Sequence, residues 1–350
     1  MILPEGLGAC PLPVTHSQSV LMGHGGGGRL TADLLNDVFL PGFQSKTLSR
    51  LEDQATVSVA GSRLAFTTDS FVVRPLFFPG GDIGKLAVYG TVNDLAVGGA
   101  RPLYLSAAFI IEEGFGINDL KRVVASMREA CEEAEVELVT GDTKVVERGK
   151  GDQLFITTSG IGLLSQGTSL SISGARPGDH ILISGTLGDH GITIMSVREG
   201  LEFETELRSD CAALHRLAES ILLAGPNVRC MRDLTRGGLA SALNELARAS
   251  RVGVRISERN IPMRREVKGA CELLGLDPLY VANEGKLMAV VPPSESERVL
   301  RAMQSSAVGT NAAVIGEVCS ENRGFVTLES VAGGERIVNM LAGEQLPRIC

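Results

Sequence analysis

The stretch Gly23-His24-Gly25-Gly26-Gly27-Gly28-Arg29 is followed by apolar residues at helical spacing over 30–39, which Pro41-Gly42 should end. Four consecutive glycines before a helix expose a row of backbone N–H groups. Together with Arg29 they would form a cradle for phosphate. Glycine content alone favours a flexible linker instead. The segment is therefore either a linker or the entry to a phosphate-binding domain.

Two familiar phosphate motifs do not fit. The spacing Gly23-x-Gly25-x-x-Gly28 satisfies the dinucleotide fingerprint, but the residues after Phe43 make a poor parallel strand. Residues 80–85 resemble a Walker loop. Pro79, however, stands in place of the leading glycine, and Leu86 in place of the Ser or Thr that meets magnesium.

Three short apolar runs each end in an acidic residue, namely Asp69, Asp94 and Asp142. Carboxylates that project from neighbouring strand ends would suit Mg²⁺, whose octahedron is completed by water and nucleotide phosphates. Each aspartate alone is more typical of a turn or a helix cap. With the glycine segment and with Lys144 beside Asp142, a magnesium–nucleotide site becomes as good an interpretation as three turn residues.

Two further segments have a structural and a chemical interpretation. Arg232-Asp233-Leu234-Thr235-Arg236-Gly237-Gly238 opens an amphipathic helix. Asp233 either caps that helix or binds a second metal, while the two glycines would admit a phosphate to the helix N-terminus. Glu284, which precedes a strong strand, is either a turn residue or a base at a cleft.

Length and composition predict the domain organisation. A chain of 350 residues exceeds one usual core, so two domains are expected. Helical and strand-like stretches mix in both halves, which indicates α/β and α+β folds, and a Ser- and Gly-rich stretch near 164–178 separates them. We expect an N-terminal extension over 1–22, a first domain over 23–170, a second over 171–340 and a mobile tail over 341–350.

Charge and hydropathy exclude several classes of protein. A net charge of −8 and 4% aromatic residues argue against binding to nucleic acid or anionic membranes. Residues 153–175 are uncharged, but they are too rich in Ser, Thr, Gly and Gln for a membrane helix. The N-terminus lacks the basic segment of a signal peptide. These features predict a cytoplasmic protein.

The seven cysteines contain no C-x-x-C pair, so a structural zinc site has no support. Five of them fall in or beside apolar runs and are typical of small core residues, namely Cys131, Cys211, Cys230, Cys271 and Cys319. Cys350 differs because it is the last residue. A thiol on a mobile tail can visit two active sites, although a chance terminal cysteine is the alternative. Arg348 would favour its thiolate, whereas the terminal carboxylate would oppose it.

Together these motifs resemble the aminoimidazole-ribotide-synthetase-like, or PurM-like, ATP-binding superfamily. The resemblance is carried by residues 24–30, Thr68-Asp69-Ser70, 91–96, 140–144, 176–179, 184–191 and 232–238. The closing Pro347-Arg348-Ile349-Cys350 resembles the carbamoyl dehydratases of [NiFe]-hydrogenase maturation. The match runs from about Met22 to the last residue.

The resemblance implies an N-terminal α/β domain that dimerises through its mixed sheet, a C-terminal α+β domain, and ATP in a cleft under the glycine-rich segment. It implies that a carbamoyltransferase, HypF, loads a carbamoyl group onto the terminal cysteine. ATP-dependent dehydration would then yield the S-cyanate with ADP and phosphate. A HypC–HypD complex that carries iron would accept the cyano group.

On the matching positions the resemblance also implies residue roles. The expected Mg²⁺ ligands are Asp69, Asp94 and Asp142, with Asp233 as a further candidate. The expected ATP contacts are Gly25, Gly26, Gly27, Gly28, Arg29, Asn93, Asp142, Thr143 and Asp233. Lys144 and Glu284 would act on the carbamoyl group that Cys350 carries, with Glu284 as the base.

Two other functions stay open at this point. A kinase or synthetase of the same superfamily, such as selenophosphate synthetase, would want a reactive cysteine near the glycine-rich segment, where only Cys10 stands. A non-catalytic scaffold whose tail docks a partner would consume no nucleotide. Nucleotide consumption by the carbamoylated protein separates the favoured function from both.

Overall fold

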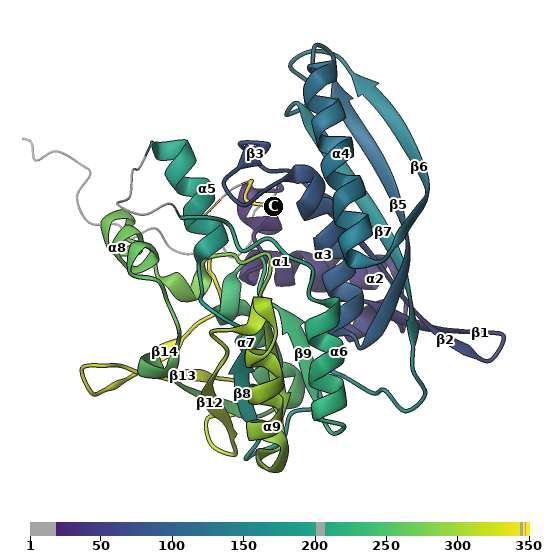
Figure 1. Cartoon of the computed structure of the whole chain (residues 1–350). Helices are drawn as coiled ribbons and strands as arrows, with labels where there is room; N and C mark the ends of the chain where they lie inside the picture. Colours follow the sequence, from purple (N-terminus) through teal and green to yellow (C-terminus); the bar gives the residue numbers. More distant parts are fainter. Residues whose placement is uncertain (1–18, 201–206, 344–345, 347) are drawn as a thin grey trace, which may run out of the picture.

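The computed structural model describes residues 19–200, 207–343, 346 and 348–350, and it contains two sheets, each flanked by helices (Figure 1). This arrangement confirms the mixed α/β and α+β class. Most of the predicted N-terminal extension, including Cys10, lies outside the described residues. None of the helices within them combines the length and apolar character that a membrane crossing requires.

The first sheet has five strands in the order β1-β2-β7-β5-β6. Their bounds are β1 (Ala55–Val59), β2 (Ser62–Phe71), β7 (Leu154–Leu164), β5 (Ala100–Glu112) and β6 (Glu137–Val146). Side chains alternate between faces, so Ala65 and Thr67 are buried while Phe66 between them is 45% exposed. Helix α3 (Ile83–Val97) covers the buried face, and Figure 1 shows no helix of the described chain on the other.

Helix α3 is the central helix of the molecule. It is apolar almost all round because the sheet lies on one side and α4 (Ile117–Ala134), α6 (His215–Ala224) and strand β9 lie on the others. Asp82 caps it by accepting hydrogen bonds from Gly84 N and Lys85 N at 2.8 and 3.2 Å. The N-cap residue of α4 is Gly116, which has no side chain to accept a hydrogen bond.

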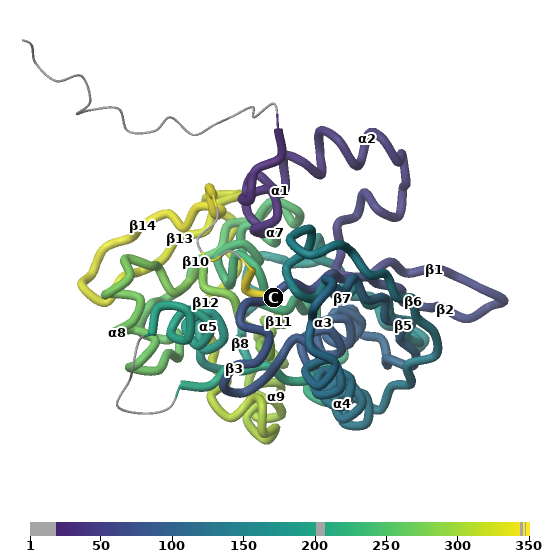
Figure 2. The backbone as a smooth tube through the Cα atoms, turned by 90° about the horizontal axis from the view of Figure 1, so that it is seen from above, coloured from purple at the N-terminus to yellow at the C-terminus, as the bar shows by residue number. Residues whose placement is uncertain are grey.

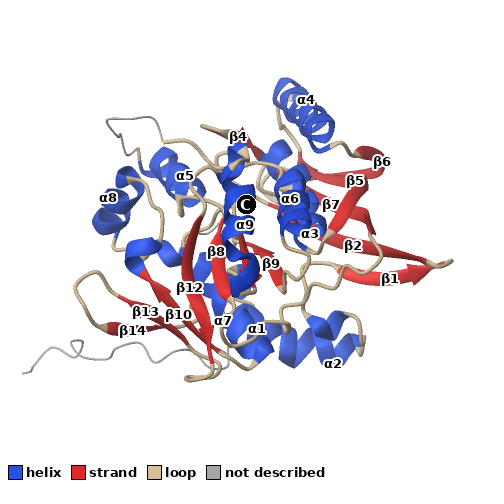
Figure 3. Cartoon of the chain, turned by 60° about the horizontal axis from the view of Figure 1, so that its bottom comes forward, coloured by secondary structure: helices blue, strands red, loops and turns tan. Residues whose placement is uncertain are grey.

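The second sheet has seven strands in the order β14-β13-β10-β12-β8-β11-β9. Their bounds are β14 (Glu335–Val338), β13 (Val326–Glu329), β10 (Gly253–Ser257), β12 (Ala313–Cys319), β8 (His180–Ile183), β11 (Leu287–Val291) and β9 (Cys230–Asp233). One face packs on α7 (Gly238–Ser250), and the other on α6 and α9 (Pro293–Gln304). Because both faces are covered, β11 is apolar at every position. Figure 3 shows the two sheets as separate groups of strands.

A helical arm precedes the first sheet. It consists of α1 (Arg29–Leu34), a π-helical turn η2 (Leu35–Phe39) and α2 (Leu40–Phe43), so it continues past the stop expected at Pro41. Figure 2 shows α1 beside α7 and α2 reaching toward β1, which places the arm across both halves of the molecule. The remaining elements are α5 (Asp189–Glu199), α8 (Arg265–Leu274), η1 (Met22–Gly25), η3 (Leu48–Arg50), η4 (Glu258–Asn260), η5 (Pro278–Tyr280), η6 (Ala307–Gly309), β3 (Phe77–Phe78) and β4 (Gly81–Asp82).

The end of the chain folds back into the protein. Leu346, Ile349 and Cys350 are buried in the same apolar cluster as Phe71 and Val281. The tail backbone pairs with the segment after β2, since Val72 N–H donates to Cys350 O at 3.0 Å and Arg74 N–H to Arg348 O at 3.3 Å. The described tail residues are therefore seated against the protein in this structure, and the predicted mobility of residues 341–350 stays a prediction.

Candidate functional site

A cavity of about 810 Å³ lies at the junction of the two halves, where α3 meets β9. The arm, the end of β2, helix α3, the segment from β9 to α7 and the tail all contribute to its wall. Among the residues expected from the sequence, those that line it are Gly27, Gly28, Asp69, Asp94, Asp233, Glu284 and Cys350. Segments from the whole length of the chain thus meet in one space.

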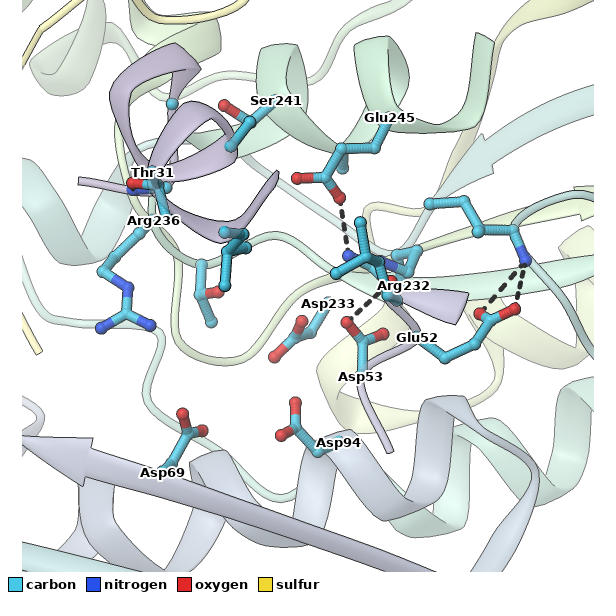
Figure 4. Close-up of a pocket in the computed structure, with 18 of the residues that line it drawn as sticks. Thr31, Glu52, Asp53, Asp69, Asp94, Arg232, Asp233, Arg236, Ser241 and Glu245 are labelled. Carbon is cyan, nitrogen blue, oxygen red and sulfur yellow. Dashed lines mark hydrogen bonds and ion pairs between the residues drawn. The ribbon is translucent and has the colours of Figure 1, made fainter. Parts of the chain in front are cut away.

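Four aspartates face this space (Figure 4). Asp53, Asp94 and Asp233 each place one oxygen within 4.8 Å of the others, and Asp69 lies beside them. Asp94 comes from helix α3, so its expected position at a strand end is wrong. Asp53 was missed by the sequence analysis, although the acidic pair Glu52-Asp53 directly before a strand-like run was the available signal.

Burial is the main cause that raises the pKa of each carboxyl in this cluster. For Asp94 the pKa lies well above its ordinary value, and the neighbouring charges of Asp69 and Asp233 raise it further. For Asp233 burial raises the pKa to about 6, against the opposing effect of Arg232. Crowded carboxylates of this kind are suited to bind a divalent cation that prefers oxygen ligands. Among such cations, Mg²⁺ is the one that usually accompanies a bound nucleotide.

Two arginines enclose the acidic cluster. Arg232 forms ion pairs with Asp53 at 2.8 Å and with Glu245 at 2.6 Å, both largely shielded from water. Arg236 lies between the cluster and the tail, and interaction with Cys350 and then Asp69 raises its pKa. The cation beside the terminal cysteine is therefore Arg236. Arg348 pairs instead with Asp152 at 3.0 Å, so the expectation that it favours the thiolate is wrong for the seated tail.

The Cys350 thiol is buried in the cavity beside Glu284. Burial raises its pKa far above the ordinary value, and the Glu284 charge adds to the effect. Burial likewise raises the pKa of the Glu284 carboxyl, whose Oε1 has no hydrogen-bond partner among the described residues. The terminal thiol and a buried carboxyl therefore lie side by side in one cavity.

The loop that carries Glu284 is held rigidly. Asn283 accepts a hydrogen bond from Gly188 N–H at 2.8 Å and donates to Leu234 O at 2.9 Å. Gly285 packs so closely on Asp210 that a Cβ atom there would lie 1.9 Å from its backbone oxygen. The carboxyl of Glu284 consequently points into the cavity with little freedom, as a base requires.

The glycine segment is packed and is not a free linker. A Cβ atom on Gly27 would lie 2.6 Å from Arg236 O, and one on Gly28 would lie 2.3 Å from Leu341 O. Gly27 also has φ +71°, a conformation that favours glycine. Gly25 and Gly26 line a second cavity of about 470 Å³, whose wall also includes the tail residues Leu346, Ile349 and Cys350.

Two expected nucleotide contacts are not brought to the cavity. Arg29 is 58% exposed, with its guanidinium 3.9 Å from Asp33. Asn93 is buried, and its amide holds the backbone of Ala212, Leu214 and Glu284. Within the chain, the Asn93 side chain therefore holds the loop before α6 and the segment that carries Glu284.

Asp142, Thr143 and Lys144 also lie away from this cavity. They belong to β6, an edge strand that is exposed along nearly its whole length. The Asp142 and Lys144 side chains are 66% and 72% exposed and approach each other to 3.7 Å. The sequence analysis expected Asp142 to bind the same ion as Asp69 and Asp94. Within a single chain these residues do not come together.

The register of the sheet explains this separation. Asp142 pairs with Ala108, Ala108 with Thr157, and Thr157 with Ser70. Paired residues share a face, and Ser70 alternates with Asp69, so Asp142 and Asp69 project from opposite faces. Three strand spacings, about 14 Å, also lie between their backbones.

Replacing Asp94 by Asn should stabilise the ion-free protein and abolish its stabilisation by Mg²⁺. Folding raises the pKa of the Asp94 carboxyl. Such a group contributes to the stability of the folded state at a pH below the pKa that it has in the unfolded chain. This contribution is lost as the pH rises through the pKa that the group has in the folded protein. At neutral pH Asp94 is therefore destabilising unless a cation binds. We expect the variant to melt about 2–4 °C higher in chelator.

Differential scanning fluorimetry with and without Mg²⁺ measures both effects. Asp119→Asn is the matched control, since this aspartate is exposed on α4 and pairs only with Arg122 among the described residues. The control should shift neither melting temperature. Equal Mg²⁺ stabilisation in Asp94→Asn and the wild type would contradict the assignment of Asp94 to the ion.

Comparison with known proteins agrees with this geometry. The AIR synthase related protein N-terminal domain matches residues 51–164, and its C-terminal domain matches residues 176–329. Carbamoyl dehydratase HypE of Azotobacter vinelandii is 55% identical over 332 residues, which cover 95% of this chain and 97% of that protein. The chain belongs to the HypE family.

Two solved structures of the HypE family are also similar to the chain. HypE in the HypE–HypF complex shares 49% identity with a TM-score of 0.84, over 88% of this chain and 99% of that one. HypE in complex with ATP shares 48% identity with a TM-score of 0.80, over 95% and 100%. Membership of the HypE family confirms the superfamily and the two-domain fold predicted from the sequence motifs.

Proposed function

We propose that the protein is an ATP-dependent carbamoyl dehydratase that converts a carboxamide on its own Cys350 sulfur into an S-cyanate for [NiFe]-hydrogenase maturation. One observation carries the proposal: the Cys350 thiol lies in the same cavity as the acidic cluster and the Glu284 carboxyl, whose Oε1 has no hydrogen-bond partner among the described residues. The names of the relatives and the ATP complex of a relative support it.

The reaction needs a poor leaving group to become a good one. The carboxamide oxygen of S–C(=O)NH₂ attacks the γ-phosphorus of ATP, and ADP leaves. The C–O bond then breaks as phosphate departs, and the N–H protons are removed to form C≡N. The balance is S-carboxamide plus ATP giving S-cyanate, ADP, phosphate and one proton.

The residues around Cys350 match these tasks. Glu284 would take the N–H proton, since a buried carboxylate with a raised pKa is a good acceptor near neutral pH. Arg236 would neutralise charge on the transferring phosphoryl group. Asp53, Asp94 and Asp233, with Asp69 beside them, would hold Mg²⁺, which neutralises phosphate charge when bound.

Loading of the carbamoyl group would take place with the tail outside the cavity. A thiol attacks as its thiolate, and burial keeps the seated Cys350 protonated by raising its pKa. In water the ordinary thiol pKa of ~8.5 leaves a few per cent thiolate at neutral pH. The partner enzyme would be the carbamoyltransferase HypF, as the solved complex of a relative supports, and a HypC–HypD complex would accept the cyano group.

Mass spectrometry of the C-terminal peptide tests the function directly. After incubation with HypF, carbamoyl phosphate and ATP, the peptide should first gain a carbamoyl group and then lose one water. Omitting ATP should stop the sequence at the carbamoyl stage. A peptide that never loses water, although ATP binds, would reject the dehydratase.

We further propose a homodimer joined through the uncovered face of the first sheet. Large side chains on this face are partly exposed, at 38–45%, namely Phe66, Tyr104, Ile110, Ile161 and Leu163. An uncovered apolar sheet face of this size favours a second copy of the same sheet. Asp142 and Lys144 lie on this face and would reach the cavity of the partner chain, whereas Thr143 between them lies on the opposite face.

Mixed dimers test the contribution of Asp142 from the second copy. Asp142→Asn and Glu284→Gln should each be inactive alone, and Asp142→Asn should also bind Mg-ATP more weakly. A refolded one-to-one mixture should recover about a quarter of wild-type activity, since half the dimers are mixed and each keeps one intact site. Full activity of Asp142→Asn, or a monomeric mass by light scattering, would contradict the proposal.

A further inference from the structure

The His190 imidazole is fully buried near the start of α5 and touches the tail one residue before Cys350. Its Nε2 lies 2.7 Å from the carbonyl oxygen of Ile349, and its Nδ1 lies 2.8 Å from Oγ of Ser209. A carbonyl oxygen can only accept, so Nε2–H is the donor and Nδ1 accepts from the Ser209 hydroxyl. The chemical steps proposed above make no use of this side chain.

The protein fixes the ring independently of the tail. Ser209 Oγ accepts from Cys211 N–H at 3.1 Å, and Ser209 N–H donates to Pro79 O at 2.9 Å. The Phe78 ring meets the imidazole edge to face, with centroids 5.5 Å apart. One orientation and one tautomer therefore persist, and Nε2–H is aimed at the place that the Ile349 carbonyl occupies.

The two hydrogen bonds that the Arg348 carbonyl accepts are more accessible to water. Arg348 O accepts from Arg74 N–H and from the Arg198 side chain, both at the surface of the molecule. Water can replace such donors when the tail leaves. The Nε2–H group of His190 is enclosed, so either the Ile349 carbonyl or an entering water has to satisfy it.

We propose that His190 is a positioning residue that holds the tail in the cavity. It thereby sets the equilibrium between the seated tail, in which Cys350 undergoes dehydration, and the tail outside the cavity, in which Cys350 is loaded. The inference rests on the proposed function, in which the sulfur reacts in two places. Removing the donor leaves the buried Ile349 carbonyl unpaired and should weaken the seated position about tenfold.

Alkylation of Cys350 measures seating without any turnover. The unloaded full-length protein is treated with iodoacetamide, and a Glu-specific protease then releases the peptide that begins at Gln345. His190→Phe should raise the Cys350 alkylation rate about tenfold, whereas His190→Gln, which keeps a nitrogen donor, should stay within about twofold. His180→Phe, at the far end of β8, is the matched control and should leave the rate unchanged.

A second variant protects the test against misfolding. Ser209→Ala keeps the imidazole and removes the hydroxyl that fixes its tautomer, so it should raise the alkylation rate about threefold. Wild-type alkylation rates in both folded His190→Phe and Ser209→Ala would overturn the proposal. If His190→Phe does not fold, the result with Ser209→Ala decides.

Turnover distinguishes positioning from a general structural role. In His190→Phe the partner should load Cys350 at least as fast as in the wild type, while dehydration of the loaded tail should slow about tenfold. Parallel loss of both rates would indicate a structural role only and overturn the proposal. If the wild type itself never dehydrates the loaded tail, the proposed function fails, yet the alkylation rates still test whether His190 holds the tail.

Discussion

Cys350→Ser should abolish S-cyanate formation and carbamoyl loading while leaving the fold and Mg-ATP binding intact. Serine keeps the shape of the buried side chain beside Glu284, so the tail can still seat. It loses the nucleophile, because an alkoxide is scarcely available near neutral pH whereas a thiol of pKa ~8.5 is partly ionised. The mass of the C-terminal peptide after loading and ATP treatment is the measurement.

Core cysteines provide the matched controls for this substitution. Cys131 lies on α4 and Cys271 on α8, and both are buried in the apolar core. Their Ala variants should melt at lower temperature through lost packing, and their S-cyanate yield should equal that of the wild type. If Cys350→Ser still forms an ATP-dependent thiocyanate on another cysteine, Cys350 is not the carrier.

Glu284→Gln should slow dehydration of the loaded tail by about 10²–10⁴-fold, the usual contribution of a general base. The amide matches the carboxyl in size but cannot take the N–H proton. Loading by the partner should continue, because it occurs with the tail outside the cavity. Single-turnover assays on the carbamoylated protein, followed by peptide mass, separate the two steps.

The control for Glu284→Gln is Glu297→Gln, an exposed position on α9 that pairs with Arg301. It should retain the wild-type rate. Since the Glu284 carboxyl is buried with an unpartnered oxygen, neutralising it should also raise the melting temperature. A dehydration rate within about twofold of the wild type would show that another group takes the proton.

Much of the fold follows from local sequence patterns. The apolar spacing of residues 30–39 predicts a helix, and α1 (Arg29–Leu34) with η2 (Leu35–Phe39) occupies that place. The glycine segment and residues 232–238 are each identifiable from the sequence as candidate phosphate-binding segments because their chemistry is local. Backbone N–H groups, helix N-termini and close backbone approach need no distant partner. Cys350 is identifiable as a candidate carrier residue from its position at the end of the sequence.

The convergence of the site depended on the tertiary structure. Asp53, Asp94 and Asp233 come from a loop, a helix and a strand, and no sequence spacing states which faces of those elements meet. The same limit explains Asp142: its sequence neighbourhood resembles that of Asp69, yet the sheet register turns the two to opposite faces. A period of two residues defines a face but not what covers it.

The identity of Cys350 follows from the sequence, whereas its environment follows from the tertiary structure. From the sequence, Cys350 is identifiable as a terminal thiol with Arg348 as its nearest cation. Only the folded chain encloses that thiol beside Glu284 and Arg236 and turns Arg348 away to Asp152. Burial and charge are sums over neighbours from many segments, so the ionisation of the sulfur is a property of the cavity. Sequence patterns identify the residues that can carry the chemistry, whereas packing between distant segments determines their environment.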